Sequence, residues 1–369
     1  MPESNIAEVH ERLGAQLLQI DGISLPEKYS SVEEECLTVR KSSALFDISH
    51  FGRVLLTGKD SLEFLNRIST NDLNGLRPGM GKQTFLTTEK GRIVDLCTAY
   101  QREEGILLLT SPGNSEKVMK WMEKFIVSED VKVRDVSGEV ALFLVAGPMA
   151  PEFLKETAYS SYKTFLDIEK MRRNDFIKAF VGSREIVLSK SNLVMMNGYL
   201  IMVISEFASG IWEDLVYSLR KLGGTPAGLQ TFEVLRIENG TPVFPNELNE
   251  DVNPLEVNLL DAVHNNKGCY IGQEVIARLQ TYDKVRKRLV GLLSTSKLPH
   301  GGKIFDQKPA DTAGTEIGVV TSSVKSPGLG KEIALGYLSV KHLVPGSKYA
   351  VKVGSRNVEA ELSSLPFLV

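Results

Sequence analysis

The segment from residue 266 to residue 278 places a cysteine where it could carry out chemistry. Cys269 follows Lys267 and stands between two glycines, and the residues from Gln273 to Leu279 suit a helix. A thiol at the start of a helix lies near the positive end of the helix dipole, and the lysine adds a second positive charge. Both effects stabilise the thiolate, which is the form that acts as nucleophile and metal ligand. The sequence therefore predicts a reactive or ligand cysteine, with a small buried residue packed beside glycines as the structural alternative.

The other residues that could bind a metal or carry out catalysis are scattered. The chain has three cysteines, Cys36, Cys97 and Cys269, and no C-x-x-C pair. Such a count fits a reducing compartment and argues against a self-contained zinc or iron–sulfur site, which needs about four ligands. A cluster that Cys269 bridges between two chains, or that a small thiol completes, stays open. Of the dispersed histidines, His50 is expected to be structural rather than a base.

The composition is that of an ordinary globular protein. The 369 residues are 42% hydrophobic and 24% charged, with a formal net charge of −3. The length allows two or three domains, and the charge argues against a general nucleic-acid binder, which would need a basic surplus. No apolar run is long enough to span a membrane, and the first eight residues lack the features of a targeting segment.

Most of the chain alternates short strands with helices. Apolar residues at helical spacing predict helices, and alternation predicts strands joined by tight turns. Helices are expected at 30–43, 61–68, 115–127, 209–222 and 229–239, and strands at 53–57, 83–87, 92–100, 105–110, 131–136 and 140–146. Hairpins join these strands more often than long crossovers. This predicts an α+β fold with antiparallel sheets and not a doubly wound nucleotide-binding fold.

The pattern changes after residue 286. Short strands are expected at 288–293, 318–323, 334–338, 349–353 and 358–362, and turns with glycine or proline separate them. Such a series predicts a small all-β barrel or sandwich at the C-terminal end.

Three segments resemble those of a known superfamily. Residues 267–274, Lys-Gly-Cys-Tyr-Ile-Gly-Gln-Glu, look like the signature of the YgfZ-type proteins, which are relatives of the folate-dependent glycine-cleavage T-protein. Residues 45–52, Leu-Phe-Asp-Ile-Ser-His-Phe-Gly, resemble the superfamily's early Phe-Asp-x-Ser-His segment. Residues 235–242, Leu-Arg-Ile-Glu-Asn-Gly-Thr-Pro, resemble its Leu-Arg-Ile-Glu-x-Gly-x-Pro segment. The three matches follow the superfamily's order along the chain.

The resemblance implies a GcvT-like arrangement of three domains around a central opening. The first α+β domain, of the folate-binding type, is expected to comprise residues 1–45 and 138–285. A second α+β domain is expected at 46–137, and a C-terminal β-barrel at 286–369.

The resemblance also points to positions that hold folate in T-proteins. These proteins share a Gly-Gly-x-x-Asp-Asp-Leu segment, in which one aspartate is the acid/base group beside the folate. Here Asp95 survives and Leu96 takes the second position, and the two point to opposite faces of a strand. Either Asp95 takes the role or the role is lost, and a solvent-facing Asp95 is the structural alternative. The pterin-binding glutamate and an arginine of T-proteins are replaced by Leu200 and Phe232.

The resemblance implies a tetrahydrofolate-binding accessory protein that supports iron–sulfur cluster assembly or repair, with a cluster bound only transiently, if at all. Cys269 would be the functional thiol, and Lys267 and Arg278 would tune it or hold anionic groups. The residues expected to bind the folate are Asp95, Arg236, Glu238, Lys267, Tyr270 and Arg278.

Alternatives remain for two of these residues and for the function of the whole protein. A buried Arg236–Glu238 pair that only holds its helix is the structural alternative for those two residues. For the whole protein, one alternative is a folate-dependent one-carbon transferase or demethylase that uses Asp95 as a catalytic residue. Another is a scaffold without catalysis. The expected partners are iron–sulfur assembly proteins or client enzymes in a bacterial cytoplasm or a plastid stroma, and no membrane is expected among them.

Overall fold

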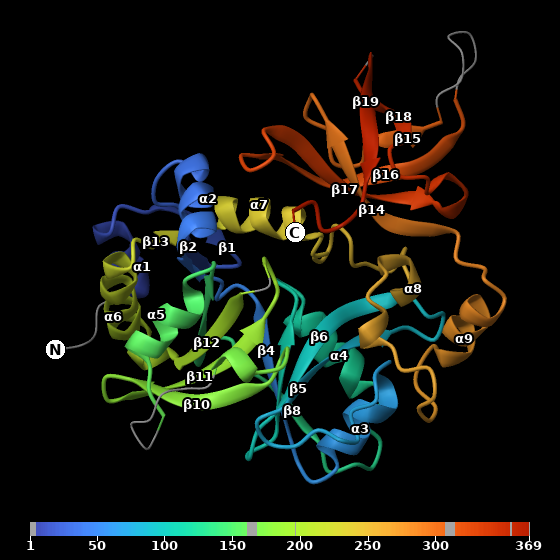
Figure 1. Cartoon of the computed structure of the whole chain (residues 1–369). Helices are drawn as coiled ribbons and strands as arrows, with labels where there is room; N and C mark the ends of the chain where they lie inside the picture. Colours follow the sequence, from blue (N-terminus) through green and yellow to red (C-terminus); the bar gives the residue numbers. More distant parts are fainter. Residues whose placement is uncertain (1–4, 161–167, 196, 307–313, 355, 369) are drawn as a thin grey trace.

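The computed structural model describes residues 5–160, 168–195, 197–306, 314–354 and 356–368. It consists of two open sheets with their helices and a closed barrel, and the barrel lies at one side of the molecule, in orange and red in Figure 1. A two-stranded hairpin of β1 (Gln16–Ile20) and β2 (Ile23–Lys28) lies near the first sheet. The expected α+β class with a C-terminal β-barrel is confirmed.

The first sheet has six strands in the order β10-β11-β12-β9-β3-β13. Neighbouring strands run antiparallel except β13, which pairs parallel with β3. The strands are β3 (Ala44–Asp47), β9 (Val140–Ala146), β10 (Phe176–Val181), β11 (Arg184–Ser191), β12 (Gly198–Ile204) and β13 (Thr225–Ala227). Helices α1 (Ile6–Arg12), α5 (Ala150–Thr157) and α6 (Ala208–Lys221) pack on one face through a single apolar cluster.

The second sheet has five antiparallel strands in the order β5-β6-β7-β4-β8. They are β4 (Gly52–Thr57), β5 (Gly81–Thr87), β6 (Ile93–Gln101), β7 (Ile106–Thr110) and β8 (Lys132–Asp135). Helices α3 (Ser61–Ile68) and α4 (Ser115–Glu123) share an apolar cluster with this sheet. The predicted helix at 115–127 is too long, because after Glu123 the backbone turns into i→i+3 bonds at Phe125 and Ile126.

The barrel closes in the order β14-β17-β16-β15-β18-β19. Its strands are β14 (Lys287–Ser294), β15 (Lys303–Phe305), β16 (Glu316–Ser326), β17 (Lys331–Ser339), β18 (Lys348–Val353) and β19 (Arg356–Ser363). Closure leaves no free sheet edge, and the inward side chains form one apolar cluster. Because β15 has only three residues, its alternation is too short to be seen in the sequence.

Connecting helices join the three parts. They are α2 (Val32–Lys41), α7 (Leu229–Asn239), α8 (Pro254–Val257) and α9 (Gln273–Thr281), and short 3₁₀ turns lie at Ile168–Lys170, Ser205–Phe207, Leu260–Ala262 and Val340–His342. Helix α7 is buried on two sides: Phe232 and Leu235 pack in a cluster shared by both sheets, and Ile237 packs against the barrel. Figure 1 shows α7 between the first sheet and the barrel. Within the described ranges, no helix is long and apolar enough to cross a membrane.

Candidate functional site

Two adjoining cavities form the central opening between the three parts of the chain. The larger, here pocket A, has a volume of about 760 Å³ and lies between the β1–β2 hairpin, α7 and strands β16 and β17 of the barrel. The smaller, pocket B, has about 400 Å³ and lies between β5, β6 and β7 and the segment that follows α7. Phe51, Pro112 and Val243 line both. A ligand in one pocket would therefore lie next to a ligand in the other.

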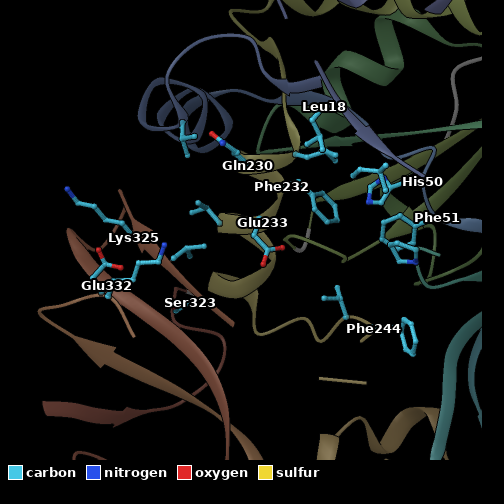
Figure 2. Close-up of a pocket in the computed structure, with 18 residues that line it drawn as sticks. Leu18, His50, Phe51, Gln230, Phe232, Glu233, Phe244, Ser323, Lys325 and Glu332 are labelled. Atoms are coloured by element: carbon cyan, nitrogen blue, oxygen red, sulfur yellow. The ribbon is translucent and has the colours of Figure 1, made fainter. Parts of the chain in front are cut away.

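Pocket A has mostly apolar walls with polar groups at its two ends. Figure 2 shows Phe51 and Phe232 beside the cavity, His50 next to Phe51, and Lys325 and Glu332 on the barrel. The edge of the Phe232 ring meets Phe51 at a centroid distance of 6.2 Å. Such a cavity suits a flat, largely apolar ligand with polar ends.

His50 presents an unused polar atom at this site. Its Nδ1 is buried and has no hydrogen-bond partner among the described residues. Burial lowers the pKa of His50 to about 4, so the imidazole is neutral at pH 7. Because buried polar groups are rarely left unpaired, the expected structural role does not account for this ring, and a ligand in pocket A would supply the partner.

Pocket B is more polar. Its lining includes Gln83, Thr98, Ser111, Arg173, Asn192 and Thr241. Leu96 also lines it, so the position that is an aspartate in T-proteins holds an apolar side chain at the wall of the opening. The arginine position of T-proteins, Phe232, lies at the wall of pocket A, whereas Leu200 is buried in the sheet.

Asp95 lies behind the pocket wall rather than in it. The predicted alternation along β6 holds, since Leu96 lines pocket B and Asp95 does not. Asp95 is fully buried, so the solvent-facing alternative is wrong. Its carboxylate accepts hydrogen bonds from Ser111 N at 3.0 Å, Ser111 Oγ at 2.5 Å and its neighbour Leu96 N at 2.9 Å. Burial raises its pKa to about 6, and these bonds act in the opposite direction. Asp95 therefore anchors the end of β7 to β6, a structural task that the sequence did not indicate.

Arg236 is also structural. Its side chain is 1% exposed and donates to Glu247 Oε2 at 3.1 Å, Ser322 Oγ at 2.8 Å and Thr241 O at 3.1 Å. Glu247 in turn accepts from Val243 N at 3.1 Å. Arg236 thus ties α7 to the barrel and holds the segment that separates the two pockets. Its Nε also donates to Glu233 Oε2 at 2.7 Å, and Glu233 lines pocket A, whereas Arg236 itself lines neither cavity. The expected buried pair therefore exists, but the carboxylate partners of Arg236 are Glu233 and Glu247 rather than Glu238.

Glu238 belongs to a separate buried contact. It accepts from Arg40 on α2 and from Ser326 Oγ on the barrel. These bonds hold the C-terminal half of α7 to α2 on one side and to β16 on the other. Like Arg236, Glu238 lies outside the walls of both pockets.

The segment around Cys269 lies away from the opening. Helix α9 begins at Gln273, as predicted, and its N-cap Gly272 has a φ of +80°. A Cβ at Gly272 would stand 2.6 Å from Thr88 O, so only glycine fits against the β5–β6 turn. Cys269 is exposed, which removes the alternative of a small buried residue.

Two residues next to Cys269, Lys267 and Tyr270, have partners inside the protein. The Lys267 ammonium donates to Asn66 O at 2.6 Å, to Ser69 O at 2.8 Å and to Asn71 O. It is occupied by backbone oxygens and fixes the loop to the end of α3, in place of the expected contact with anionic groups. Tyr270 is buried in an apolar cluster, and Arg278 is exposed on α9. None of the predicted site residues lines pocket A or B.

The residues that do line the opening come from distant parts of the chain. Phe51 lies inside a motif that the sequence made visible, but Pro112, Arg173 and Val243 carried no signal. In the described part of the chain, no group of three or more histidine, cysteine, aspartate or glutamate residues could hold a metal ion.

Comparisons with known proteins agree with this architecture. The chain matches the model of the GCVT N-terminal domain over residues 6–267 and that of the glycine cleavage T-protein C-terminal barrel domain over residues 287–368. It is 31% identical to an aminomethyltransferase of Thermotoga neapolitana, over 100% of this chain and 98% of that protein. It is 30% identical to an aminomethyltransferase of Bacillus subtilis, over 98% of this chain and 97% of that protein.

A solved structure shows the same fold. The crystal structure of the glycine cleavage system aminomethyltransferase T from Bartonella henselae superimposes with a TM-score of 0.84 at 24% identity, covering 98% of this chain and 96% of that one. Both domain models and the full-length relatives lead to one conclusion: the chain belongs to the glycine cleavage T-protein (GcvT-like) family.

Proposed function

We propose that this protein binds tetrahydrofolate in the central opening and uses it in one-carbon transfer. The proposal rests on the pair of adjoining pockets, one apolar and aromatic and the other more polar, at the meeting point of the three parts. Full-length relatives named aminomethyltransferase support the reaction class. A reduced folate supplies the nitrogen atoms that carry the one-carbon unit when it is bound.

The residues of pocket A fit such a ligand. The rings of Phe51, Phe232 and Phe244 offer apolar surface to a pterin or an aminobenzoyl ring, and the unpaired His50 Nδ1 offers a hydrogen bond. At the barrel end, Lys297 and Lys325 also line the pocket, and neither is in an ion pair within the described residues. Their ammonium groups would attract the glutamate carboxylates of a folate.

The reaction is expected to differ from aminomethyl transfer in glycine cleavage. Leu96 stands at the wall of pocket B where T-proteins have an acid/base aspartate, and Asp95 is withdrawn behind the wall. The groups at the described wall of pocket A that could accept a proton are His50, which is neutral at pH 7, and the carboxylates of Glu233 and Glu332.

The transfer activity can be tested with labelled folate. [¹³C]Methylene-tetrahydrofolate is incubated with the protein and with small amines, and the methylene carbon is followed by NMR. We expect the protein to accelerate the loss of this signal, and a reconstituted glycine-cleavage assay to show no activity. If tetrahydrofolate binds but the methylene signal is lost no faster with any amine, the protein binds folate without transferring its one-carbon unit.

A second candidate is the YgfZ-type role in iron–sulfur cluster assembly or repair, with the cluster as cargo. The observation in its favour is the exposed Cys269 in the YgfZ-like segment, held on a loop that packs against the second sheet. Partners would be iron–sulfur assembly proteins or client enzymes. Both candidates use the same folate site and differ in the need for the thiol.

Alkylation and complementation test this candidate. We expect Cys269 to react with iodoacetamide at pH 7.5 at least tenfold faster than Cys36 and Cys97, because those two are buried. Burial also raises the pKa of Cys36 to about 12 and that of Cys97 well above its ordinary value. In guanidinium chloride all three should react alike, which is the control.

Complementation addresses the role of the thiol itself. Cys269→Ser should fold normally but fail to restore iron–sulfur enzyme activity in cells that lack the protein. Full complementation by the serine variant would remove the second candidate and leave the first untouched.

A further inference from the structure

Arg173 lies where the central opening meets a third cavity. Pocket C, of about 490 Å³, opens between β5 and the segment that precedes β10. Gln83 and Arg173 line both pocket B and pocket C, so they form the partition between them. Arg173 is exposed and lines both cavities.

The backbone around Arg173 is held on two sides. Asn174 N donates to Lys190 O at 2.9 Å, and Phe176 N donates to Gly79 O at 2.9 Å. The carbonyl of Asn174 lies so close to Gly81 that a Cβ there would stand 2.4 Å from it. The side chain therefore projects from a fixed segment and not from a free loop.

The guanidinium of Arg173 lacks an anionic partner. Its Nη2 donates to Gln83 Oε1, a neutral acceptor, and no ion pair joins it to any described residue. Asp261, on the wall of pocket C, acts on it electrostatically but does not reach ion-pair distance. The neighbouring Arg172 differs, since its Nε pairs with Asp175 at 2.9 Å. Four of the five N–H donors of Arg173 thus have no partner among the residues that the structure describes.

Arg173 is also the sole charged side chain among the described residues that line pocket B. The rest of the lining is apolar or carries neutral hydrogen-bonding groups such as Thr98, Asn192 and Thr241. Partial burial lowers the pKa of Arg173, which indicates that the cation has lost part of its hydration, yet arginine stays charged at any physiological pH. A single, partly desolvated cation in a pocket whose described lining has no carboxylate favours an anionic ligand.

We propose that Arg173 binds the carboxylate of a small molecule in pocket B, where it would stand beside a folate in pocket A. The proposal rests on the proposed function for the identity of the neighbour, but the arginine site can be tested without folate. The planar guanidinium matches a carboxylate in a two-bond geometry, and Gln83 holds it in place for that contact. The chemical class is a small amino acid or a similar short carboxylate, the size of which suits a cavity of about 400 Å³. The carboxylates of the folate's glutamate tail could bind the same guanidinium, and they are the second possible source of the ligand group.

The test compares Arg173→Gln with Arg172→Gln, the matched neighbour. Binding of glycine and acetate is measured by NMR titration, with and without tetrahydrofolate, and glycinamide serves as the probe without a carboxylate. We expect Arg173→Gln to weaken glycine binding about ten- to a hundredfold, as for the loss of a charge-assisted pair, while Arg172→Gln leaves it unchanged. Binding should also weaken as salt rises, and glycinamide should not compete. Equal thermal midpoints for both variants show that the fold is intact.

A second arm separates the two sources of the carboxylate. Tetrahydrofolate is compared with tetrahydropteroate, which has no glutamate. If Arg173→Gln weakens the binding of tetrahydrofolate but not that of tetrahydropteroate or glycine, the arginine binds the folate tail. If it weakens the binding of glycine alone, the arginine binds a second substrate. If neither affinity changes, the proposal is overturned. Failure of the wild-type protein to bind tetrahydrofolate would refute the proposed function and would leave the glycine result to decide on Arg173.

Discussion

Replacing Arg236 by methionine should lower the free energy of unfolding by about 3–5 kcal/mol, the usual cost of breaking a buried ion pair. The reason is the carboxylate left behind. Glu247 is 0% exposed, and Arg236 is the cation that compensates its charge inside the protein. The same change removes the bond to Ser322 that ties α7 to the barrel. A shift of the urea unfolding curve measures the loss.

Arg12→Met is the matched control for this change. The Arg12–Glu213 pair has side-chain exposures of 57% and 51%, so its removal should cost less than about 1 kcal/mol. The double variant Arg236→Met, Glu247→Leu should regain most of the loss, because it buries no unpaired charge. Equal small effects of Arg236→Met and Arg12→Met would contradict the structural role given to Arg236. Because its network also holds Val243, Arg236→Met should weaken ligand binding in both pockets.

Asp95→Asn should destabilise the protein by about 1–3 kcal/mol even though the side chains have the same shape. The carboxylate accepts from Ser111 N and Ser111 Oγ on separate oxygens, and an amide offers only one oxygen. One buried donor is therefore left facing an NH₂ group.

The pH dependence of this effect has a definite sign. The pKa of Asp95 is about 6 in the folded protein, raised from an ordinary value near 4. Between these values the folded state binds more protons than the unfolded state, so the stability of the wild-type protein falls as pH rises from about 4 to about 6, by at most about 3 kcal/mol. Asp95→Asn lacks this slope, and its deficit should be largest near pH 4 and smaller above pH 6.

Subtracting the stability of Asp95→Asn from that of the wild type at each pH removes the contribution of His50, because both proteins contain this histidine. His50 acts in the opposite direction: its pKa is lowered by burial, so its part of the stability is lost as pH falls below about 6.5. A variant as stable as the wild type at every pH, yet inactive in one-carbon transfer, would make Asp95 a chemical group and not an anchor.

The sequence predicted those features that depend on neighbouring residues. Period-two alternation located the long barrel strands and placed Asp95 and Leu96 on opposite faces of β6, because strand geometry is local. The glycines before Gln273 located the start of α9 for the same reason. Strand β13 was missed, since its three residues are defined only by parallel pairing with β3, far away in the chain.

The site itself could not be derived in this way. Its walls combine Phe51, Gln83, Pro112, Arg173 and Val243, which only the folded chain brings together. The sequence indicated Lys267 and Arg236 through their motifs, but both are occupied inside the protein by acceptors that come from distant segments. Whether a charged residue meets a ligand or a buried partner depends on such distant contacts, which no local pattern encodes.

The central claim is that the opening shared by pockets A and B holds a reduced folate, and calorimetric titration with tetrahydrofolate tests it most directly. The wild-type protein is compared with Val243→Trp, which adds a large ring where the two pockets meet. It is also compared with Val127→Trp, a change at an 88% exposed position that lines neither cavity. The account predicts saturable binding of one tetrahydrofolate per chain in the wild type and in Val127→Trp, and a loss of at least a hundredfold in affinity in Val243→Trp. No binding to the wild type, or undiminished binding to Val243→Trp, would contradict it.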